Sequence, residues 1–222
     1  MSELTSDDAM TPSHCPRRKP QRLFLGVAAC ALSTAVGLIS LRYVAPSRPA
    51  PAPIPNASAH PLALALHAVP AALALIIMPL QLHAGFRTRH PRAHRVIGRT
   101  YAGLVGVASL AALRIAPMAL GGPVSAAGFT ALALAWVAST ALGARAAMRR
   151  RFDVHRGWMT RSAALTFAAV TLRLLLPLST RVMGFDFVTA YRAIAWLCWL
   201  PNLLVAEWWL RRDAGKPRRP GH

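Results

Sequence analysis

Long apolar segments alternate with short arginine-rich segments along this chain, and this pattern constrains its fold more than any other feature. The apolar segments cover residues 23–41, 62–83, 96–116, 124–147, 158–178 and 188–210. A helix of about 20 apolar residues crosses the hydrocarbon core of a bilayer, and only helices and closed barrels satisfy their backbone polar groups there. The sequence therefore predicts an all-α, polytopic transmembrane helical bundle of about six spanning helices.

The segments outside the apolar runs divide the chain further. Prolines and alanines dominate residues 45–61, which is typical of an extended, exposed loop. We predict a disordered basic tail at 1–22, a first transmembrane helix at 23–44, an external loop at 45–61, a five-helix membrane domain at 62–210 and a basic tail at 211–222. The first apolar run is interpreted as a retained helix rather than a cleaved signal peptide, because the chain stays apolar long after Cys30.

The charge is strongly basic and is segregated from the apolar runs. The chain holds 26 Lys+Arg and 7 Asp+Glu, a formal net charge of +19. Because the basic residues border apolar stretches, we expect anionic lipid headgroups as their counter-charge and no binding to nucleic acid. Most of them precede the first helix, follow the sixth, or lie between helices two and three and between four and five. The positive-inside rule then places both termini in the cytoplasm.

Several kinds of chemistry find no support in the sequence. Cys15, Cys30 and Cys198 form no CxxC pair, so neither a disulfide framework nor a zinc site is predicted. The chain has no Gly-x-Ser-x-Gly elbow and no phosphate-binding glycine loop. Whether the protein is an enzyme stays open at this point.

Polar residues inside the spans are the candidates for function, because they are costly in a membrane and usually face the bundle interior. An outer layer consists of His67, Arg114 and Arg173. Arginine and histidine from three helices could bind an anion or a carbonyl oxygen. The alternative is that the arginines snorkel to the headgroups and that His67 bonds to backbone.

An inner layer consists of Gln81, His83, His94, Arg99, His155, Arg161, Asn202 and Glu207. His94 and His155 begin different helices and could hold a b-type haem iron axially, with His83 as an alternative ligand. They could equally be solvated in a basic interface. Glu207, the sole acid within the predicted spans, is expected to form a structural pair with Arg99 or Arg161.

Two helix entrances resemble each other, which raises the question of an internal repeat. His94-Arg95-Val96-Ile97-Gly98-Arg99 and His155-Arg156-Gly157-Trp158-Met159-Thr160-Arg161 each lead through an apolar helix to a lone arginine, Arg114 or Arg173. Helices two–three and four–five are either related hairpins or similar by coincidence, since basic residues are common at membrane borders.

Three groups of motifs carry a resemblance to a known family. They are Leu66-His67 with Pro79-Leu80-Gln81 and His94 to Tyr101, then Asp153 to Ser162 with Ala168 to Arg173, and last Trp199 to Trp208. Over residues 62–210 the chain resembles the predicted prokaryotic membrane proteins of domain of unknown function 2306. The resemblance implies a multi-pass protein of the bacterial inner membrane and no established activity. The positions matching the family pattern are His67, His94, His155, Arg161, Arg173, Asn202 and Glu207.

Three functions remain as hypotheses. The first is a redox-type membrane protein that binds b-type haem or quinone, based on the histidine-bearing helix entrances. The second is a transporter or binding protein for a small molecule or lipid, for which so short a chain would need a homo-oligomer. The third is an accessory structural membrane protein without chemistry.

Overall fold

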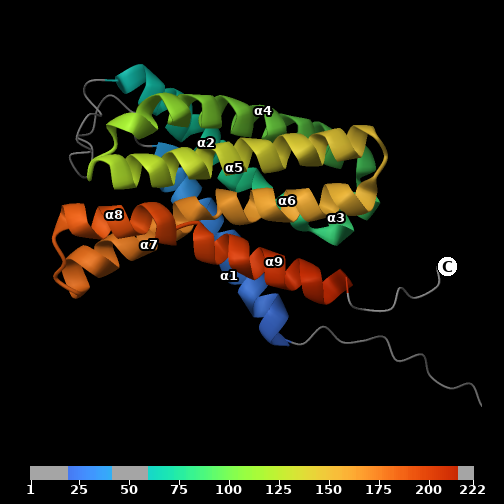
Figure 1. Cartoon of the computed structure of the whole chain (residues 1–222). Helices are drawn as coiled ribbons and strands as arrows, with labels where there is room; N and C mark the ends of the chain where they lie inside the picture. The colour runs from blue at the N-terminus through green and yellow to red at the C-terminus, as the bar shows by residue number, and fades with distance from the viewer. Residues whose placement is uncertain (1–19, 42–59, 215–222) are drawn as a thin grey trace, which may run out of the picture.

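The computed structural model describes residues 20–41 and 60–214, and helices form nearly all of this part of the chain (Figure 1). The predicted tails and the Pro/Ala-rich loop lie mostly outside the described residues. The elements in chain order are α1 (Pro20–Leu41), α2 (Pro61–Leu82), α3 (Ala84–Arg89), α4 (Pro91–Ile115), the 3₁₀ turn η2 (Ala116–Met118), α5 (Pro123–Met148), α6 (Phe152–Thr166), α7 (Ala168–Pro177), the π-helical turn η3 (Leu178–Val182), α8 (Phe187–Leu197) and α9 (Leu200–Ala214).

Five helical segments are long and apolar enough to cross a membrane, which confirms the predicted all-α transmembrane bundle. They are Pro61–Leu82, Pro91–Met118, Pro123–Met148, Phe152–Val182 and Phe187–Ala214. A shorter apolar helix, Gly26–Leu41, corresponds to the predicted first span. It packs against α2, where a Cβ atom on Gly37 would lie 3.1 Å from the Ala72 carbonyl oxygen.

The helices reach further into the arginine-rich segments than hydropathy predicts. α4 begins at Pro91 instead of residue 96, and α6 begins at Phe152 instead of residue 158. Proline is favoured in the first turn of a helix and arginine is a good helix former, whereas hydropathy marks only the part of a helix that lies in lipid. His94 and His155 therefore lie in the first turns of helices and not in loops.

Two spans are interrupted, which the sequence analysis did not predict. The fifth is divided at Phe167, between α6 and α7, and the sixth at Cys198 and Trp199, between α8 and α9. Pro201 contributes to the second interruption, because it has no N–H to donate to the carbonyl of Leu197. In contrast, α2 runs without interruption through Pro70 and Pro79.

Many of the buried side chains of the bundle are small, which allows close helix packing. α2 pairs with α4, and α5 pairs with both α4 and α6 (Figure 1). At Gly128 of α5, a Cβ atom would lie only 2.8 Å from the carbonyl oxygen of Ala195 in α8. Glycine at this position lets the two backbones approach, as small residues do in membrane bundles.

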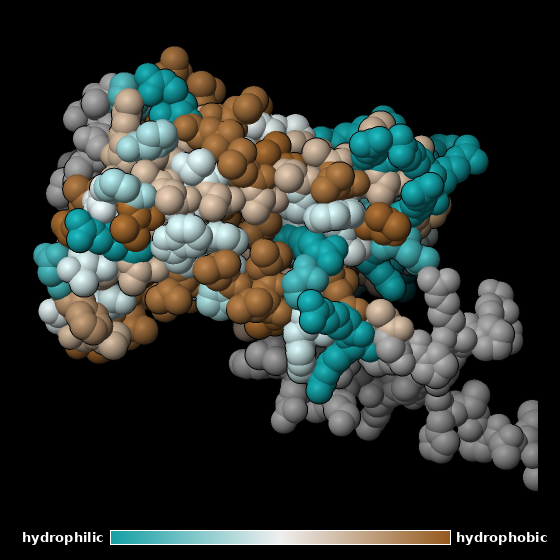
Figure 2. Space-filling view, viewed as in Figure 1, coloured by the Kyte–Doolittle hydropathy of each residue, from teal (hydrophilic) through white to brown (hydrophobic). Residues whose placement is uncertain are grey.

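One end of the bundle holds most of the exposed arginines of the described residues, and we call it the basic end. α2, α5 and α9 finish there, and α4 and α6 begin there. Figure 2 shows hydrophilic side chains gathered at this end, on the right of the view. Its exposed arginines are Arg87, Arg89, Arg92, Arg95, Arg99, Arg145, Arg149, Arg150, Arg151, Arg156, Arg211 and Arg212.

Candidate functional site

Gln81 and His94 bring polar side chains from α2 and α4 together at the basic end. A Cβ atom on Gly98 would lie 3.2 Å from the Oε1 atom of Gln81, so the side chain of Gln81 lies against α4 at this glycine. His94 is one helical turn before Gly98 and on the same face of α4. The two side chains therefore border the same short stretch of α4.

The nitrogen atoms of this pair are buried and lack protein partners. Neither Nε2 of Gln81 nor Nδ1 of His94 has a hydrogen-bond partner, although both atoms are buried. A buried polar atom left unsatisfied costs about 1–3 kcal/mol, so such atoms are rare in folded proteins. The two atoms come from neighbouring helices, and their side chains border the same stretch of α4.

His155 lies in the same region, as the sequence analysis expected. Its Nδ1 atom is 2.8 Å from the carbonyl oxygen of Gly143 in α5, which holds the half-buried ring in place. His155 and Arg87 both lie within electrostatic range of His94. The structure therefore gathers His94, His155 and Gln81 near the beginnings of α4 and α6.

His83 makes a local contact at the start of α3. Its side chain is exposed, and its Nδ1 atom accepts a hydrogen bond of 3.1 Å from the backbone N–H of Phe86. His83 thus caps the N-terminus of α3. Arg99 is likewise exposed on α4.

Arg161 and Glu207 form the expected ion pair, which joins α6 to α9. The Nε atom of Arg161 bonds to one carboxylate oxygen of Glu207, and its Nη2 atom bonds to the other at 2.9 Å. The guanidinium also lies over the ring of Trp158, 4.7 Å from its centroid. Bidentate geometry of this kind is among the stronger forms of arginine–carboxylate contact. We call this pair the α6–α9 latch.

Asn202 links the two helix interruptions. Its Nδ2 atom donates to Oγ1 of Thr171 and to the carbonyl of Cys198, both at 3.0 Å, and lies 3.4 Å from the carbonyl of Ala164. Ala164 precedes the interruption at Phe167, and Cys198 lies in the other interruption. One amide therefore satisfies backbone oxygens exposed where both spans break, a role that is structural.

At the end opposite the basic end, the structure brings together two of the three predicted outer residues. The Nδ1 atom of the half-buried His67 is 2.9 Å from the carbonyl oxygen of Ala108 in α4. Arg173, also half-buried, lies within electrostatic range of His67 and donates to the carbonyl of Ala169 at 3.0 Å. Arg114 is exposed on α4, as a snorkelling arginine would be.

A buried hydroxyl network, which was not predicted from the sequence, connects α4, α5 and α6. The hydroxyl of Tyr101 is 2.8 Å from Oγ of Ser162 and 2.6 Å from Oγ1 of Thr166. Thr166 also accepts from Nε1 of Trp136 at 2.9 Å, and Ser162 contacts Oγ1 of Thr140 at 2.7 Å. Serine and threonine at four-residue spacing within a span were the available signal, because such residues often bond between membrane helices.

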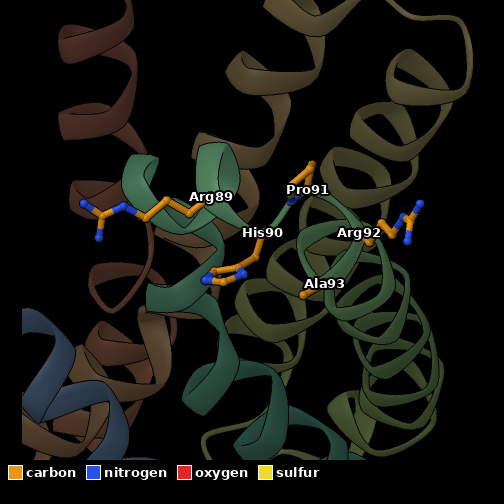
Figure 3. Close-up of a pocket in the computed structure, with 5 residues that line it drawn as sticks. All are labelled: Arg89, His90, Pro91, Arg92 and Ala93. Carbon is orange, nitrogen blue, oxygen red and sulfur yellow. The ribbon is translucent and has the colours of Figure 1, made fainter.

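A hollow of 380 Å³ lies where α3 meets α4, lined by Arg89, His90, Pro91, Arg92 and Ala93. Figure 3 shows the side chains of Arg89 and Arg92 pointing to opposite sides, so they do not converge on one ligand. Within the described part of the chain, no three His, Cys, Asp or Glu residues are grouped to hold a metal ion.

The comparisons with known proteins agree with this architecture. The family model described as "Predicted membrane protein (DUF2306)" matches residues 64–210, which confirms the resemblance found in the sequence motifs. No curated protein and no solved structure matches the chain.

Proposed function

The chain belongs to the DUF2306 family of predicted membrane proteins, and from this premise we propose that its basic end binds a redox-active amphiphile of the quinone class. The observation that carries the proposal is the pair of buried nitrogen atoms without partners, Nε2 of Gln81 and Nδ1 of His94. The amide of Gln81 donates through Nε2, and an imidazole nitrogen can donate as well. A ligand with carbonyl oxygens supplies the acceptors that both atoms lack.

The surroundings of the two donors suit an amphiphile. Leu80, Leu82 and Val96 are exposed near Gln81 and His94, so lipid-like chains can lie beside the donors. Arg87 lies within electrostatic range of His94 and favours oxygen atoms that carry negative charge. An apolar setting with a few convergent polar groups is typical of small-molecule sites.

A b-type haem is the second candidate, and one observation favours it. The Nδ1 atom of His155 is engaged with the carbonyl of Gly143, which leaves Nε2 available. Histidines that bind metals commonly use their other ring nitrogen in this way. His155 and His94 would be the protein ligands, and the haem would supply electron-transfer chemistry. A Soret band in protein purified after haem-supplemented expression tests this version.

Binding of decyl-benzoquinone to the full chain in nanodiscs tests the first candidate. We expect saturable quenching of tryptophan fluorescence, weakened about tenfold by Gln81→Leu and by His94→Phe, since each removes a hydrogen bond of about 1–1.5 kcal/mol. His83→Ala and His90→Ala remove exposed histidines at the same end and serve as matched controls. Equal affinity in all five proteins would refute the proposed site.

We also propose that the basic end faces the cytoplasm of a bacterium whose inner membrane holds the protein. The support is the concentration of exposed arginines at one end of the bundle, which the positive-inside rule assigns to the cytoplasm. Fusions of alkaline phosphatase or a fluorescent protein after residue 214 distinguish the two orientations. Phosphatase activity at this position would reverse the assignment.

A further inference from the structure

The last helix that the structure describes, α9, is held to the bundle differently from α8, which precedes it. α8 is fixed on α5 and on the turn before it. Nε of Arg192 donates to the carbonyl of Gly121 in this turn at 2.8 Å, and Nε1 of Trp196 donates to the carbonyl of Val124 in α5 at 3.2 Å. Ala190, Ile194 and Ala195 of α8 are buried. In α9, Ala206 alone is buried among the fifteen residues.

The chain bends where the fixed helix gives way to the weakly packed one. Cys198 and Trp199 separate α8 from α9, and Pro201 leaves the carbonyl of Leu197 without its usual helical donor. Figure 1 shows α9 running beside α6 and diverging from it towards the basic end. A segment with a proline at its base and few buried contacts is the kind of element that moves on a hinge.

Asn202 and Glu207 of α9 make polar contacts with α6 and α7. Asn202 lies beside the hinge and bonds to Thr171, so it can stay in place while the helix pivots. Glu207 lies five residues further on, where it forms the α6–α9 latch with Arg161. The side chains of Arg161 and Glu207 are 27% and 29% exposed, so competing ions or headgroups can reach the pair.

We propose that α9 is a lateral gate that pivots at residues 198–201 and is kept closed on α6 by the latch between Arg161 and Glu207. Opening separates α9 from α6 on the side of the bundle where His155 begins α6. Opening exposes to lipid the parts of α6 and α9 that lie nearest the basic end, and α8 stays folded. This proposal rests on the packing and the polar contacts of α9, and it does not depend on what the basic end binds.

Distances between spin labels test the gate directly. Labels are placed at Met148→Cys and Ala214→Cys, both exposed at the basic end, in full-length chain carrying Cys15→Ser, Cys30→Ser and Cys198→Ala in nanodiscs. With the latch intact we expect one main distance. Glu207→Gln and Arg161→Gln each add a longer-distance population. The charge exchange Arg161→Glu with Glu207→Arg restores the main distance, and Arg156→Gln, which alters an exposed arginine of α6, changes nothing. An unchanged distribution in both latch variants overturns the proposal.

Hydrogen exchange on the chain without substitutions gives a second test that needs no latch variant to fold. We expect amides of α9 beyond residue 203 to exchange at least tenfold faster than those of α8, since the gate opens while α8 stays fixed. Pro201→Ala restores the missing N–H at the hinge and is expected to slow exchange in α9. Equal protection of α8 and α9 would show that α9 does not open.

Discussion

Replacing the hydroxyl groups of the buried network one at a time gives a sharp test of how α4, α5 and α6 are held together. The donors can be assigned from the contacts. Thr166 donates to the carbonyl of Ser162 at 2.8 Å, so its oxygen accepts from both Trp136 and Tyr101. The hydroxyl of Tyr101 then donates to Thr166. Thr140 donates to the carbonyl of Trp136 at 2.8 Å, so the single proton of the Ser162 hydroxyl goes to either Thr140 or Tyr101.

This assignment predicts that Thr166→Val is more damaging than Tyr101→Phe, although the tyrosine is the larger side chain. Without the tyrosine hydroxyl, Thr166 still binds Trp136 and Ser162 still contacts Thr140, so no donor is orphaned. We expect a loss of about 1 kcal/mol, the value of ordinary hydrogen bonds in membrane proteins. Thr166→Val keeps the volume but leaves the buried Nε1 of Trp136 without its acceptor, whereas the hydroxyl of Tyr101 can still donate to Ser162, so we expect a cost of about 2–3 kcal/mol.

Reversible unfolding in mixed micelles, followed by circular dichroism, measures both losses. Thr160→Val is the matched control, because its exposed hydroxyl bonds only to the carbonyl of Arg156 within its own helix. It should change stability by less than about 0.5 kcal/mol. A loss from Tyr101→Phe equal to or greater than that from Thr166→Val would refute the assignment of donors and the reasoning from orphaned groups.

Three further changes test other contacts by the same unfolding measurement. Gly128→Ala should destabilise the protein by about 1–3 kcal/mol, because the new Cβ would lie 2.8 Å from the carbonyl oxygen of Ala195; a neutral result would mean that α5 and α8 are further apart. Glu207→Gln should lower the free energy of unfolding by about 1 kcal/mol, a modest value because both side chains of the pair are more than a quarter exposed. If the pair is ionic, high salt should destabilise the unsubstituted protein by a similar amount. Asp186→Ala removes the carboxylate that accepts two backbone N–H groups at the start of α8 and should cost about 1 kcal/mol, whereas Asp186→Asn should cost less.

The transmembrane fold could be predicted from the sequence because hydropathy indicates directly whether a segment lies in lipid or in water. The two interruptions did not follow, because the breaks at Phe167 and at Cys198 depend on contacts with other helices. Pro201 was visible, but Pro70 and Pro79 were equally visible and leave α2 continuous. A proline in a span therefore permits a break, and packing decides whether one occurs.

The ion pair of the site was predictable for a specific reason. Glu207 is the sole acid in the predicted spans, so it had few possible partners, and the structure selects Arg161 over Arg99. The hydroxyl network was not predictable in the same way. Tyr101, Ser162 and Thr166 read as neutral residues in apolar helices, and their spacing shows neither which helices meet nor at what depth.

The polar groups of the bundle lie at three levels along a single face of α4. His94 and Tyr101 are seven residues apart, and so are Tyr101 and Ala108, whose carbonyl binds His67. Two helical turns separate successive levels by about 10 Å. Between the level of Tyr101 and the level of Ala108, the interior is filled by Val105 of α4 and Leu75 of α2, which are at most 1% exposed. These apolar side chains therefore separate the hydroxyl network from His67. The ligand proposed for the basic end would enter from the lipid or from the adjoining solution, and the proposed lateral gate at α9 would provide the first of these routes.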